Sequence, residues 1–285
     1  MGQTVLLVGL QWGDEGKGKV IDALSERFDL VVRFQGGANA GHTIHIGQEE
    51  FILRLVPSGI LHPGTLCVIA NGVVVDPVAL TAEMAGLRQR GVDVGENLVI
   101  SDRAHVVLPH HKALDEAREA ARGKDRLGTT RNGIGPCYAD KASRCGIRFA
   151  EMIEPDVFHE RLVAVLEINN RILTQVYGAE PVDVDAAYDE YCRYAEELKP
   201  HVQDTVMLMR QALRDGKNIL LEGAQGSMLD LNFGTYPYVT SSEVVGGATV
   251  GTGIPPTRID RVIGVVKSYC SRVGTGPFPT EQDNE

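Results

Sequence analysis

The residues best suited to chemistry form one segment near the amino terminus, Gly13-Asp14-Glu15-Gly16-Lys17-Gly18-Lys19. Glycines let a backbone approach a ligand closely, and the free N–H groups at the start of a helix attract anions. The two lysines add positive charge that suits a polyphosphate. The segment therefore predicts a phosphate-binding loop, although a tight, charged turn between a strand and a helix would contain the same residue types.

This segment does not have Walker A spacing, which requires four residues between the first glycine and Gly-Lys-Ser/Thr. Six residues separate Gly9 from Gly16, and neither Ser nor Thr follows Lys17. The acids Asp14 and Glu15 would repel phosphate. An acid in this position indicates a metal ligand or a proton-transfer group. For Asp14 alone, an ordinary carboxylate at the start of a helix remains the alternative.

A second glycine-rich turn, 35–43, follows the next apolar run and contains Asn39 and His42. An imidazole there could donate a hydrogen bond to an oxygen that gains charge during a reaction. The Asn39 amide could bind a purine edge or a phosphate. Each residue could instead serve only the turn, His42 by bonding to backbone and Asn39 by adopting a left-handed conformation.

Two later segments are also rich in polar groups. Residues 123–136 are predicted to form a long loop without regular structure. Hydroxyl and basic side chains in and after that loop suit a monophosphate, or form a solvated basic face; they are Thr129, Thr130, Lys141, Arg144 and Arg148. Gln225 follows another apolar run and could bind a base. The hydroxyl-rich stretch 235–242 could likewise bind a ligand or form a solvated surface. The remaining candidates, Glu15, His62, His110 and His111, have no partner at a characteristic spacing and are predicted to be structural.

These loops need a scaffold, and the apolar runs predict one. Strands are expected at 4–10, 29–34, 65–70, 98–100, 105–108, 217–222 and 261–267, and a hairpin at 44–55. Helices are expected from 20, at 76–90 and 112–122, and in a helical excursion over about 155–215. Parallel strands bring the loops that follow them to one edge of a sheet, where ligands bind. The prediction is a single α/β domain over 1–285, with a mostly parallel central sheet flanked by helices.

The composition narrows the classes of function. With a net charge of −10, generic nucleic-acid binding is disfavoured. The sequence contains neither an apolar run long enough for a membrane span nor a recognisable signal peptide. The five cysteines form no CxxC pair, which favours a reducing cytosol over a disulfide or zinc framework. We therefore expect a cytoplasmic protein without nucleic-acid or membrane partners.

The sequence resembles the adenylosuccinate synthetase family. The resemblance rests on motifs spread over the whole chain: 11–19, 36–43, 128–130 with 133–136, Tyr138, Lys141, Arg144, 146–148, 221–226, 234–242 and 272–281. It implies a fold like that of P-loop NTPases. It also implies the GTP- and Mg²⁺-dependent joining of IMP and L-aspartate into adenylosuccinate, with release of GDP and phosphate.

The implied mechanism has two steps. Asp14 removes the N1 proton of IMP, and O6 attacks the γ-phosphorus of GTP to give 6-phosphoryl-IMP. The amine of aspartate then displaces phosphate at C6. His42 stabilises charge on the transferring phosphoryl group and acts as the acid.

The resemblance also implies residue roles. Catalysis is assigned to Asp14, His42, Lys141 and Gln225. GTP is held by Gly13, Asp14, Glu15, Gly16, Lys17, Gly18, Lys19, Gly41, His42 and Thr43. IMP is held by Asp14, Lys17, Asn39, Thr130, Arg144, Gln225 and Thr240. Mg²⁺ is held by Asp14 and the Gly41 carbonyl. Arg144 reaches the IMP phosphate of a neighbouring subunit, so a homodimer is expected.

The resemblance further implies that this chain is truncated and corresponds to about the amino-terminal two thirds of the family's chain. The loops that bind aspartate and guanine are expected beyond Glu285. The alternative to an active ligase is therefore a fragment that binds IMP and GTP phosphates without turnover. A regulatory GTPase switch is a third possibility, but the absence of Walker A spacing counts against it.

Overall fold

The computed structural model describes residues 2–282. Its centre is a seven-stranded sheet in the order β11-β1-β10-β2-β5-β7-β9, in which every neighbouring pair is parallel. The strands are β1 (Thr4–Gly9), β2 (Leu30–Arg33), β5 (Leu66–Ile69), β7 (Leu98–Ser101), β9 (Val202–Gln203), β10 (Ile219–Gly226) and β11 (Arg261–Val265). The predicted α/β class with a parallel central sheet is confirmed.

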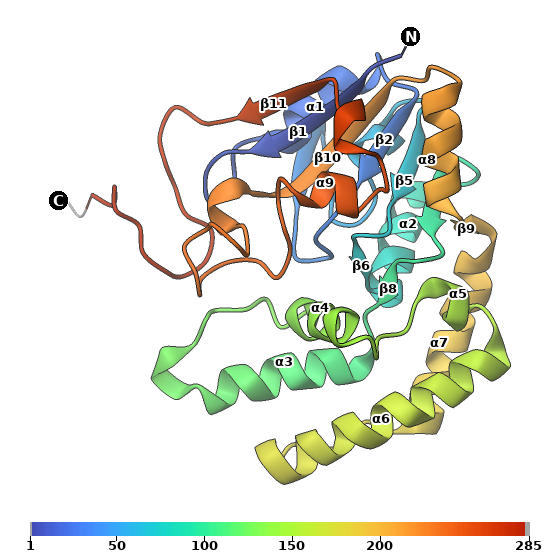
Figure 1. Cartoon of the computed structure of the whole chain (residues 1–285), viewed down its shortest axis with the longest axis vertical. Coiled ribbons are helices and arrows are strands. Elements are labelled where there is room, and N and C mark those ends of the chain that lie inside the picture. The colour runs from blue at the N-terminus through green and yellow to red at the C-terminus, as the bar shows by residue number, and fades with distance from the viewer. Residues whose placement is uncertain (1, 283–285) are drawn as a thin grey trace.

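Helices cover both faces of the sheet and extend below it (Figure 1). They are α1 (Lys17–Ser25), α2 (Pro77–Gln89), α3 (Pro109–Ala121), α4 (Ile134–Ser143), α5 (Phe149–Met152), α6 (Pro155–Tyr177), α7 (Val184–Leu198), α8 (Thr205–Arg214) and α9 (Gly247–Val250). The predicted hairpin is β3 (His42–Ile46) with β4 (Glu49–Leu53), and a short parallel pair joins β6 (Val74–Val75) to β8 (His105–Val106). Short 3-10 turns lie at Ser58–Leu61, Gly123–Asp125, Lys199–His201, Ser227–Leu229 and Pro256–Arg258.

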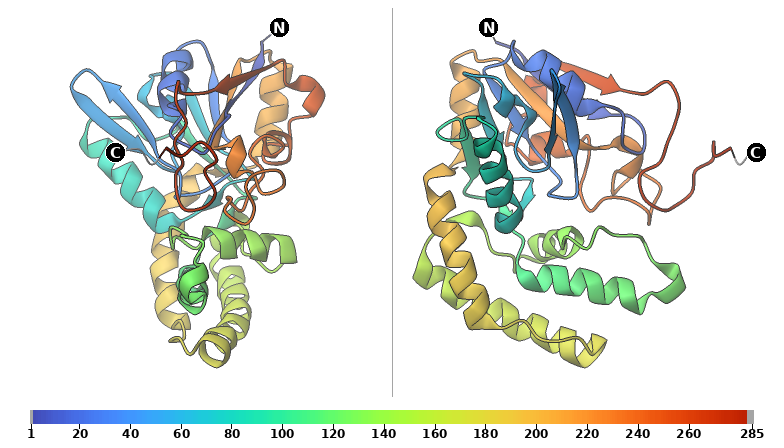
Figure 2. Two further views of the ribbon diagram at one scale, coloured as in Figure 1. Left: turned by 90° about the vertical axis from the view of Figure 1, so that its left-hand side faces the viewer. Right: turned by 180° about the vertical axis from the view of Figure 1, so that it is seen from behind.

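The inner strands β1, β2, β5, β7 and β10 are mainly apolar because both of their faces are buried. Alternate residues of β1 and β10 point to opposite sides. Leu7 and Leu220 pack with Ile21 of α1, whereas Leu221 packs with Met209 of α8 on the other face. The largest core lies under α2, α6 and α7. Figure 2 shows that α6 and α7 form a helical layer away from the sheet.

Three local predictions were wrong. The strand expected to end at residue 222 continues to Gly226, since Gly9 of β1 pairs with Gly226. The loop expected over 123–136 ends in α4, whose first turn buries Ile134 behind a left-handed Gly133 (φ 72°). The helical excursion at 155–215 contains β9, which extends the sheet beside β7. In each case contacts made with distant segments decided the structure.

The described residues contain no helix that is both long enough and apolar enough to cross a membrane.

Helices α3 and α4 are joined by a buried cluster of two histidines and one aspartate. His111 Nε2 and His110 Nε2 lie 3.1 and 3.4 Å from Asp140 Oδ2. The backbone N–H of Leu108 donates to His111 Nδ1 at 2.9 Å, so the proton of this neutral ring is on Nε2. That nitrogen is the one directed at Asp140, and it is unavailable to a metal. The cluster therefore connects α3 to α4 and has a structural role, as predicted for His110 and His111.

We expect the protein to lose stability as the pH falls from about 6.5 towards 4. Burial, reinforced by neighbouring positive charge, lowers the pKa of both His105 and His111 from 6.5 to about 4. Between these values the unfolded chain binds protons that the folded chain does not, so stability falls with falling pH by up to about 3 kcal/mol per histidine. Urea unfolding at several pH values across this range measures how the free energy of unfolding depends on pH.

The matched controls for this prediction are His111→Asn, whose oxygen can still accept from Leu108, and His45→Asn at an exposed site. The first should reduce the pH dependence to the part that His105 contributes, and the second should leave it unchanged. An unchanged slope in His111→Asn would show that another group carries the effect.

Candidate active site

The phosphate loop joins the end of β1 to the start of α1. Its backbone adopts left-handed conformations at Gly13 (φ 97°), Asp14 (φ 58°) and Gly16 (φ 83°). Gly16 is the N-cap of α1 and provides no side-chain hydrogen bond to the first turn. The first N–H groups of the helix are therefore free to bind an anion.

Glu15 is the internal acceptor of this loop. Its buried carboxylate accepts from the backbone N–H groups of Gln11 and Gly13 at 3.1 and 3.0 Å, and from Lys17 Nζ at 2.6 Å. Burial alone would raise the pKa of Glu15, but the Lys17 charge and these hydrogen bonds hold it below its usual value. Glu15 thus shapes the loop and holds Lys17 beneath it.

Asp14, in contrast, is exposed, and within residues 2–282 its carboxylate has no hydrogen-bond partner. A non-glycine residue with positive φ is uncommon and costs energy, so such residues concentrate at functional sites. The backbone therefore projects an ionisable group from the phosphate loop at an energetic cost. This is the geometry expected of a group that acts on a ligand.

The second glycine loop ends at His42, the first residue of β3, which lies against the start of α1. A Cβ atom placed on Gly18 would be 2.7 Å from His42 Cβ, so only glycine allows this approach. His42 is buried, and its Nδ1 lies 2.6 Å from Glu222 Oε1. Its Nε2 is buried without a partner among the described residues.

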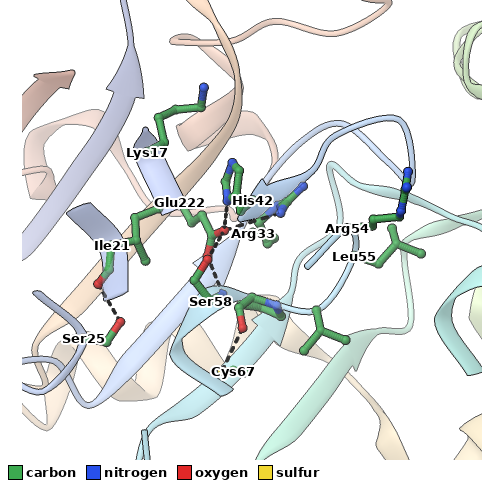
Figure 3. A network of polar contacts seen from close by, with 12 residues as sticks. Lys17, Ile21, Ser25, Arg33, His42, Arg54, Leu55, Ser58, Cys67 and Glu222 are labelled. Atoms are coloured by element: carbon green, nitrogen blue, oxygen red, sulfur yellow. Dashed lines mark hydrogen bonds and ion pairs between the residues drawn. The ribbon is translucent and has the colours of Figure 1, made fainter. Parts of the chain in front are cut away.

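Glu222 is the centre of a buried polar network (Figure 3). Besides His42, its carboxylate accepts from the N–H and the hydroxyl of Ser58, each at 2.9 Å, and from Arg33 Nη1 at 3.4 Å. Glu222 on β10 pairs in register with Arg33 on β2, so the two strands bring these charges together. Both side chains are almost completely buried.

Burial and charge act in opposition in this network. Burial alone would raise the pKa of Glu222, but the hydrogen bond from His42 and the charge of Arg33 bring it down to about 2. Burial lowers the pKa of His42, and the positive charges of Arg33 and Lys17 lower it further, against the opposing effect of Glu222. Glu222 is therefore ionised, and His42 is neutral without a ligand.

A cavity of about 470 Å³ is lined by residues of α3 and α4 and of the segments after β10 and β11. Figure 1 shows where these elements lie. Four of the predicted IMP-binding residues line the cavity: Asn39, Thr130, Gln225 and Thr240. Gln225 Oε1 and Thr240 Oγ1 are buried without a partner among the described residues. Buried polar groups are normally paired, so these two atoms indicate a polar ligand.

The loop 126–133, which includes Thr129 and Thr130, is held in place by two acids of α3. Glu119 accepts from the N–H groups of Leu127 and Gly128 at 3.2 and 3.0 Å. Asp115 accepts from the N–H group of Gly133 at 3.0 Å. The basic loop is therefore anchored at both ends against the cavity.

The loop residues Asp14, Lys17 and His42 are not part of the cavity lining, and neither are the predicted residues Lys141 and Arg144. Lys141 Nζ donates to the carbonyl of Asn71 at 3.1 Å, and burial lowers the pKa of Lys141. Arg144 is exposed at the end of α4 in a left-handed conformation (φ 66°). The structure thus brings Asn39, Thr130, Gln225 and Thr240 together, while Lys141 and Arg144 lie along α4.

Tyr138 of α4 supports the second glycine loop. Its hydroxyl accepts from the N–H of Gly36 at 2.9 Å and donates to the carbonyl of Gly72 at 2.8 Å. Tyr138→Phe removes both bonds and leaves a buried N–H unsatisfied. We expect a loss of about 1–3 kcal/mol in the free energy of unfolding, together with weaker binding in the cavity.

The measurements for Tyr138→Phe are urea unfolding and calorimetric titration with IMP. Tyr269→Phe, which changes an exposed tyrosine, is the matched control. Equal effects of the two substitutions would contradict the supporting role of the Tyr138 hydroxyl.

A second hollow, of about 600 Å³, lies at the amino-terminal edge of the sheet, around Arg27, His62 and Asn218. Two of its lining residues are already bonded to carboxylates. His62 pairs with Asp22 at 2.7 Å, and the N–H of Asn218 donates to Asp29 at 2.8 Å. No unpartnered buried group of the described residues lines this hollow, so the carboxyl-edge cavity is the better candidate for a site.

Sequence reasoning missed Glu222, Arg33 and Ser58. One signal was available: each of the apolar runs 30–33 and 219–222 ends in a single charged residue, with opposite signs. What the sequence did not indicate is that these runs are neighbouring strands, since 189 positions separate Arg33 from Glu222.

A parallel sheet with a glycine–lysine loop and a polar cavity at its carboxyl edge defines a nucleotide-binding α/β protein. The sequence model of the adenylosuccinate synthetase family matches residues 6–285. The chain belongs to this family.

Individual relatives agree with this assignment. The adenylosuccinate synthetase of Moorella thermoacetica is 55% identical over 279 residues, which cover 98% of this chain and 65% of the relative. That of Lacticaseibacillus paracasei is 55% identical over 98% of this chain and 64% of its own. The chain thus spans about two thirds of the length of these curated relatives.

Solved structures show the same fold. The fully ligated adenylosuccinate synthetase of Plasmodium falciparum superposes with a TM-score of 0.92 at 39% identity, over 99% of this chain and 66% of that one. The succinoaminodeoxyadenylate synthetase of cyanophage S-2L has a TM-score of 0.66 at 24% identity, and this likeness concerns the fold alone.

Proposed function

We propose that this protein ligates IMP and L-aspartate to adenylosuccinate at the expense of GTP. The observation that carries the proposal is the buried His42 beside the phosphate loop, with its Nε2 unpartnered, in a chain of the adenylosuccinate synthetase family. Phosphoryl transfer depends mainly on positioning and charge stabilisation, and this arrangement provides both.

Asp14 is the proposed base. Its exposed carboxylate takes the N1 proton of IMP, which makes O6 the nucleophile towards the γ-phosphorus of GTP. The glycine loop and the first turn of α1 hold the phosphates, through Gly13 to Lys19 with Gly41, His42 and Thr43. The amine of aspartate then replaces the phosphate at C6. Once the anionic phosphates are bound, His42 takes a proton on Nε2 from solvent and donates from that nitrogen to the transferring phosphoryl group.

The oxygen donors near this loop suit Mg²⁺, a cation that prefers oxygen ligands and substrate phosphates. We propose that the Asp14 carboxylate, which has no partner among residues 2–282, and the carbonyl of the exposed Gly41 hold it. When bound, Mg²⁺ neutralises charge on the GTP phosphates.

The cavity is the proposed IMP site. The unpartnered Gln225 and Thr240 oxygens support base and hydroxyl contacts there, together with Asn39, Thr130 and the loop residues Asp14 and Lys17. Lys141 and Arg144 act from α4 in this proposal, with Arg144 reaching the IMP phosphate of a second subunit. The exposure of Arg144 supports a role towards a partner in a homodimer. We place the reaction in the cytoplasm, consistent with five free cysteines.

The proposal is tested by incubating the chain with IMP, GTP, Mg²⁺ and L-aspartate and following the absorbance change of adenylosuccinate formation. Product that depends on all four components is the expected result. His42→Asn is the inactive control, because it retains a polar side chain without an acidic ring.

A second candidate function is binding of IMP and GTP phosphates without turnover. It is favoured by the fraction of the relatives that this chain spans, about 65%. Calorimetric titration with IMP separates the two. Binding without product supports the second candidate, and the absence of binding contradicts both.

A further inference from the structure

We propose that Glu222 is a positioning residue for His42: in the protein without ligand it holds the imidazole as the Nδ1–H tautomer, and it aims Nε2 at the phosphate loop, where that nitrogen takes up the proton that it later donates. The geometry carries this inference, since Nδ1 lies 2.6 Å from Glu222 Oε1 while Nε2 is buried and unpartnered among the described residues. The role of Glu222 in turnover rests on the proposed function. Its effect on the tautomer does not.

The hydrogen-bond inventory indicates which atom carries the proton. Glu222 Oε1 faces His42 Nδ1, the Ser58 hydroxyl and Arg33 Nη1, and Oε2 faces the Ser58 N–H. The Arg33 and Ser58 nitrogens can only donate, so Glu222 acts as an ionised acceptor. An ionised carboxylate requires a donor at His42 Nδ1, and a neutral ring then has a lone pair on Nε2.

Three constraints fix the position of the ring. The backbone of His42 pairs with Leu53 in the β3–β4 hairpin. Gly18 lies directly behind its Cβ, at 2.7 Å from a Cβ placed on that glycine. Glu222 binds the one ring nitrogen directed away from the loop. Backbone and packing thus fix the Cβ position, and of the residues that the structure describes, Glu222 alone bonds to the ring and sets its rotation and tautomer.

The position of Glu222 is itself fixed by the sheet. Glu222 is on the strand between β1 and β2 and pairs in register with Leu7 and Arg33. Ser58, in the segment after the hairpin, also donates to Glu222, so His42 and Ser58 contact the same carboxylate from opposite sides (Figure 3). A carboxylate behind a histidine that presents its other nitrogen to a substrate is a known arrangement for orienting an imidazole.

Glu222→Gln is the most informative substitution. A glutamine has one acceptor oxygen, whereas the site presents donors to both carboxylate oxygens. Its NH₂ group has to face either Ser58 N–H or His42 Nδ1, and in the second case the ring can accept only as the Nε2–H tautomer. The two orientations favour different tautomers, so we expect His42 to lose its single Nδ1–H form and become a mixture.

The experiment is nitrogen NMR on the full chain labelled with ¹⁵N-histidine, with the His42 signals assigned by their loss in His42→Asn. The expected wild-type result is protonated Nδ1 and bare Nε2. Glu83→Gln is the matched control. It removes a carboxylate that accepts from the N–H groups of residues 54–56 without contacting His42, and should leave the tautomer unchanged.

Two results would overturn the inference: a wild-type His42 that carries its single proton on Nε2, or an Nδ1–H signal that is unaltered in both Glu222→Gln and Glu222→Asp. Both variants are needed because a glutamine whose oxygen faces His42 keeps the Nδ1–H tautomer, whereas Glu222→Asp cannot reach the ring. It keeps the charge beside Arg33 but withdraws the carboxylate from His42, and we expect the same loss of a single tautomer.

Kinetics then connects the tautomer to the reaction. In Glu222→Gln we expect kcat to fall by about 10²- to 10⁴-fold, the usual contribution of one positioned acid or base, with the KM for IMP near that of wild type. A merely structural role would lower the folded fraction rather than kcat per folded molecule. If the wild-type chain makes no product, the proposed function fails for this chain, while the wild-type tautomer still decides the inference.

Discussion

Asp14→Asn is expected to abolish adenylosuccinate formation and to leave the fold intact. The loss follows from removing the proposed base, which typically contributes about 10²- to 10⁴-fold, together with one proposed Mg²⁺ ligand. The fold is spared because Asp14 is exposed and has a left-handed φ of 58°. Asparagine, like aspartate, tolerates this left-handed conformation.

The measurements for Asp14→Asn are the rate of product formation and the urea unfolding midpoint. Glu26→Gln, which neutralises an exposed acid at the other end of α1, is the matched control and should retain full activity. Near-normal turnover of Asp14→Asn would refute the base assignment. A large drop in stability would instead show that the loop depends on the carboxylate for its structure.

Glu222→Leu is expected to cost about 3–5 kcal/mol of folding free energy, the largest effect on stability that we predict. Arg33 is only 1% exposed, and its Nε and Nη2 already have no partner among the described residues. Removing Glu222 leaves this cation buried and uncompensated. The Ser58 N–H also loses its acceptor.

The double variant Arg33→Met/Glu222→Leu distinguishes the cost of leaving the Arg33 charge unpaired from the other effects of removing Glu222. Apolar residues fit this face of the sheet, which Val31 and Leu220 already line. We therefore expect the double variant to recover part of the stability while remaining inactive, because His42 still lacks its acceptor. A double variant no more stable than Glu222→Leu alone would contradict the cost assigned to an unpaired buried Arg33, and an active one would contradict the role of Glu222.

The elements predicted correctly from the sequence are those whose signals are local. The run before Gly9 is short, apolar and β-branched, and the glycines after it exclude continuation of a strand. Asp76 followed by Pro77 specifies a helix start, and the Asp76 side chain accepts from the N–H groups of Val78 and Ala79 as expected. Such signals act within a few residues, so no knowledge of the tertiary structure is needed.

The elements that were missed depend on distant partners. The α4 helix begins with Ile134-Gly135-Pro136, a weak helical sequence, and buries Ile134 and Cys137 beside Val74 and Val107. The strand β9 has two residues and exists because β7 offers a free edge. Neither has a periodic pattern long enough to be recognised without its neighbours.

The phosphate loop shows most clearly what the sequence determined and what the tertiary structure determined. The sequence alone determined its glycines, its lysines and the exceptional acid Asp14, because residue type and spacing are sufficient to indicate an anion-binding turn. Tertiary structure alone decided that Glu15 would hold Lys17 inside the loop, and that Glu222, from a strand 180 positions away from His42, would orient that histidine beside it. The physical reason is that a hydrogen bond depends on proximity in space, and the parallel sheet, not the order of the chain, sets which residues are close.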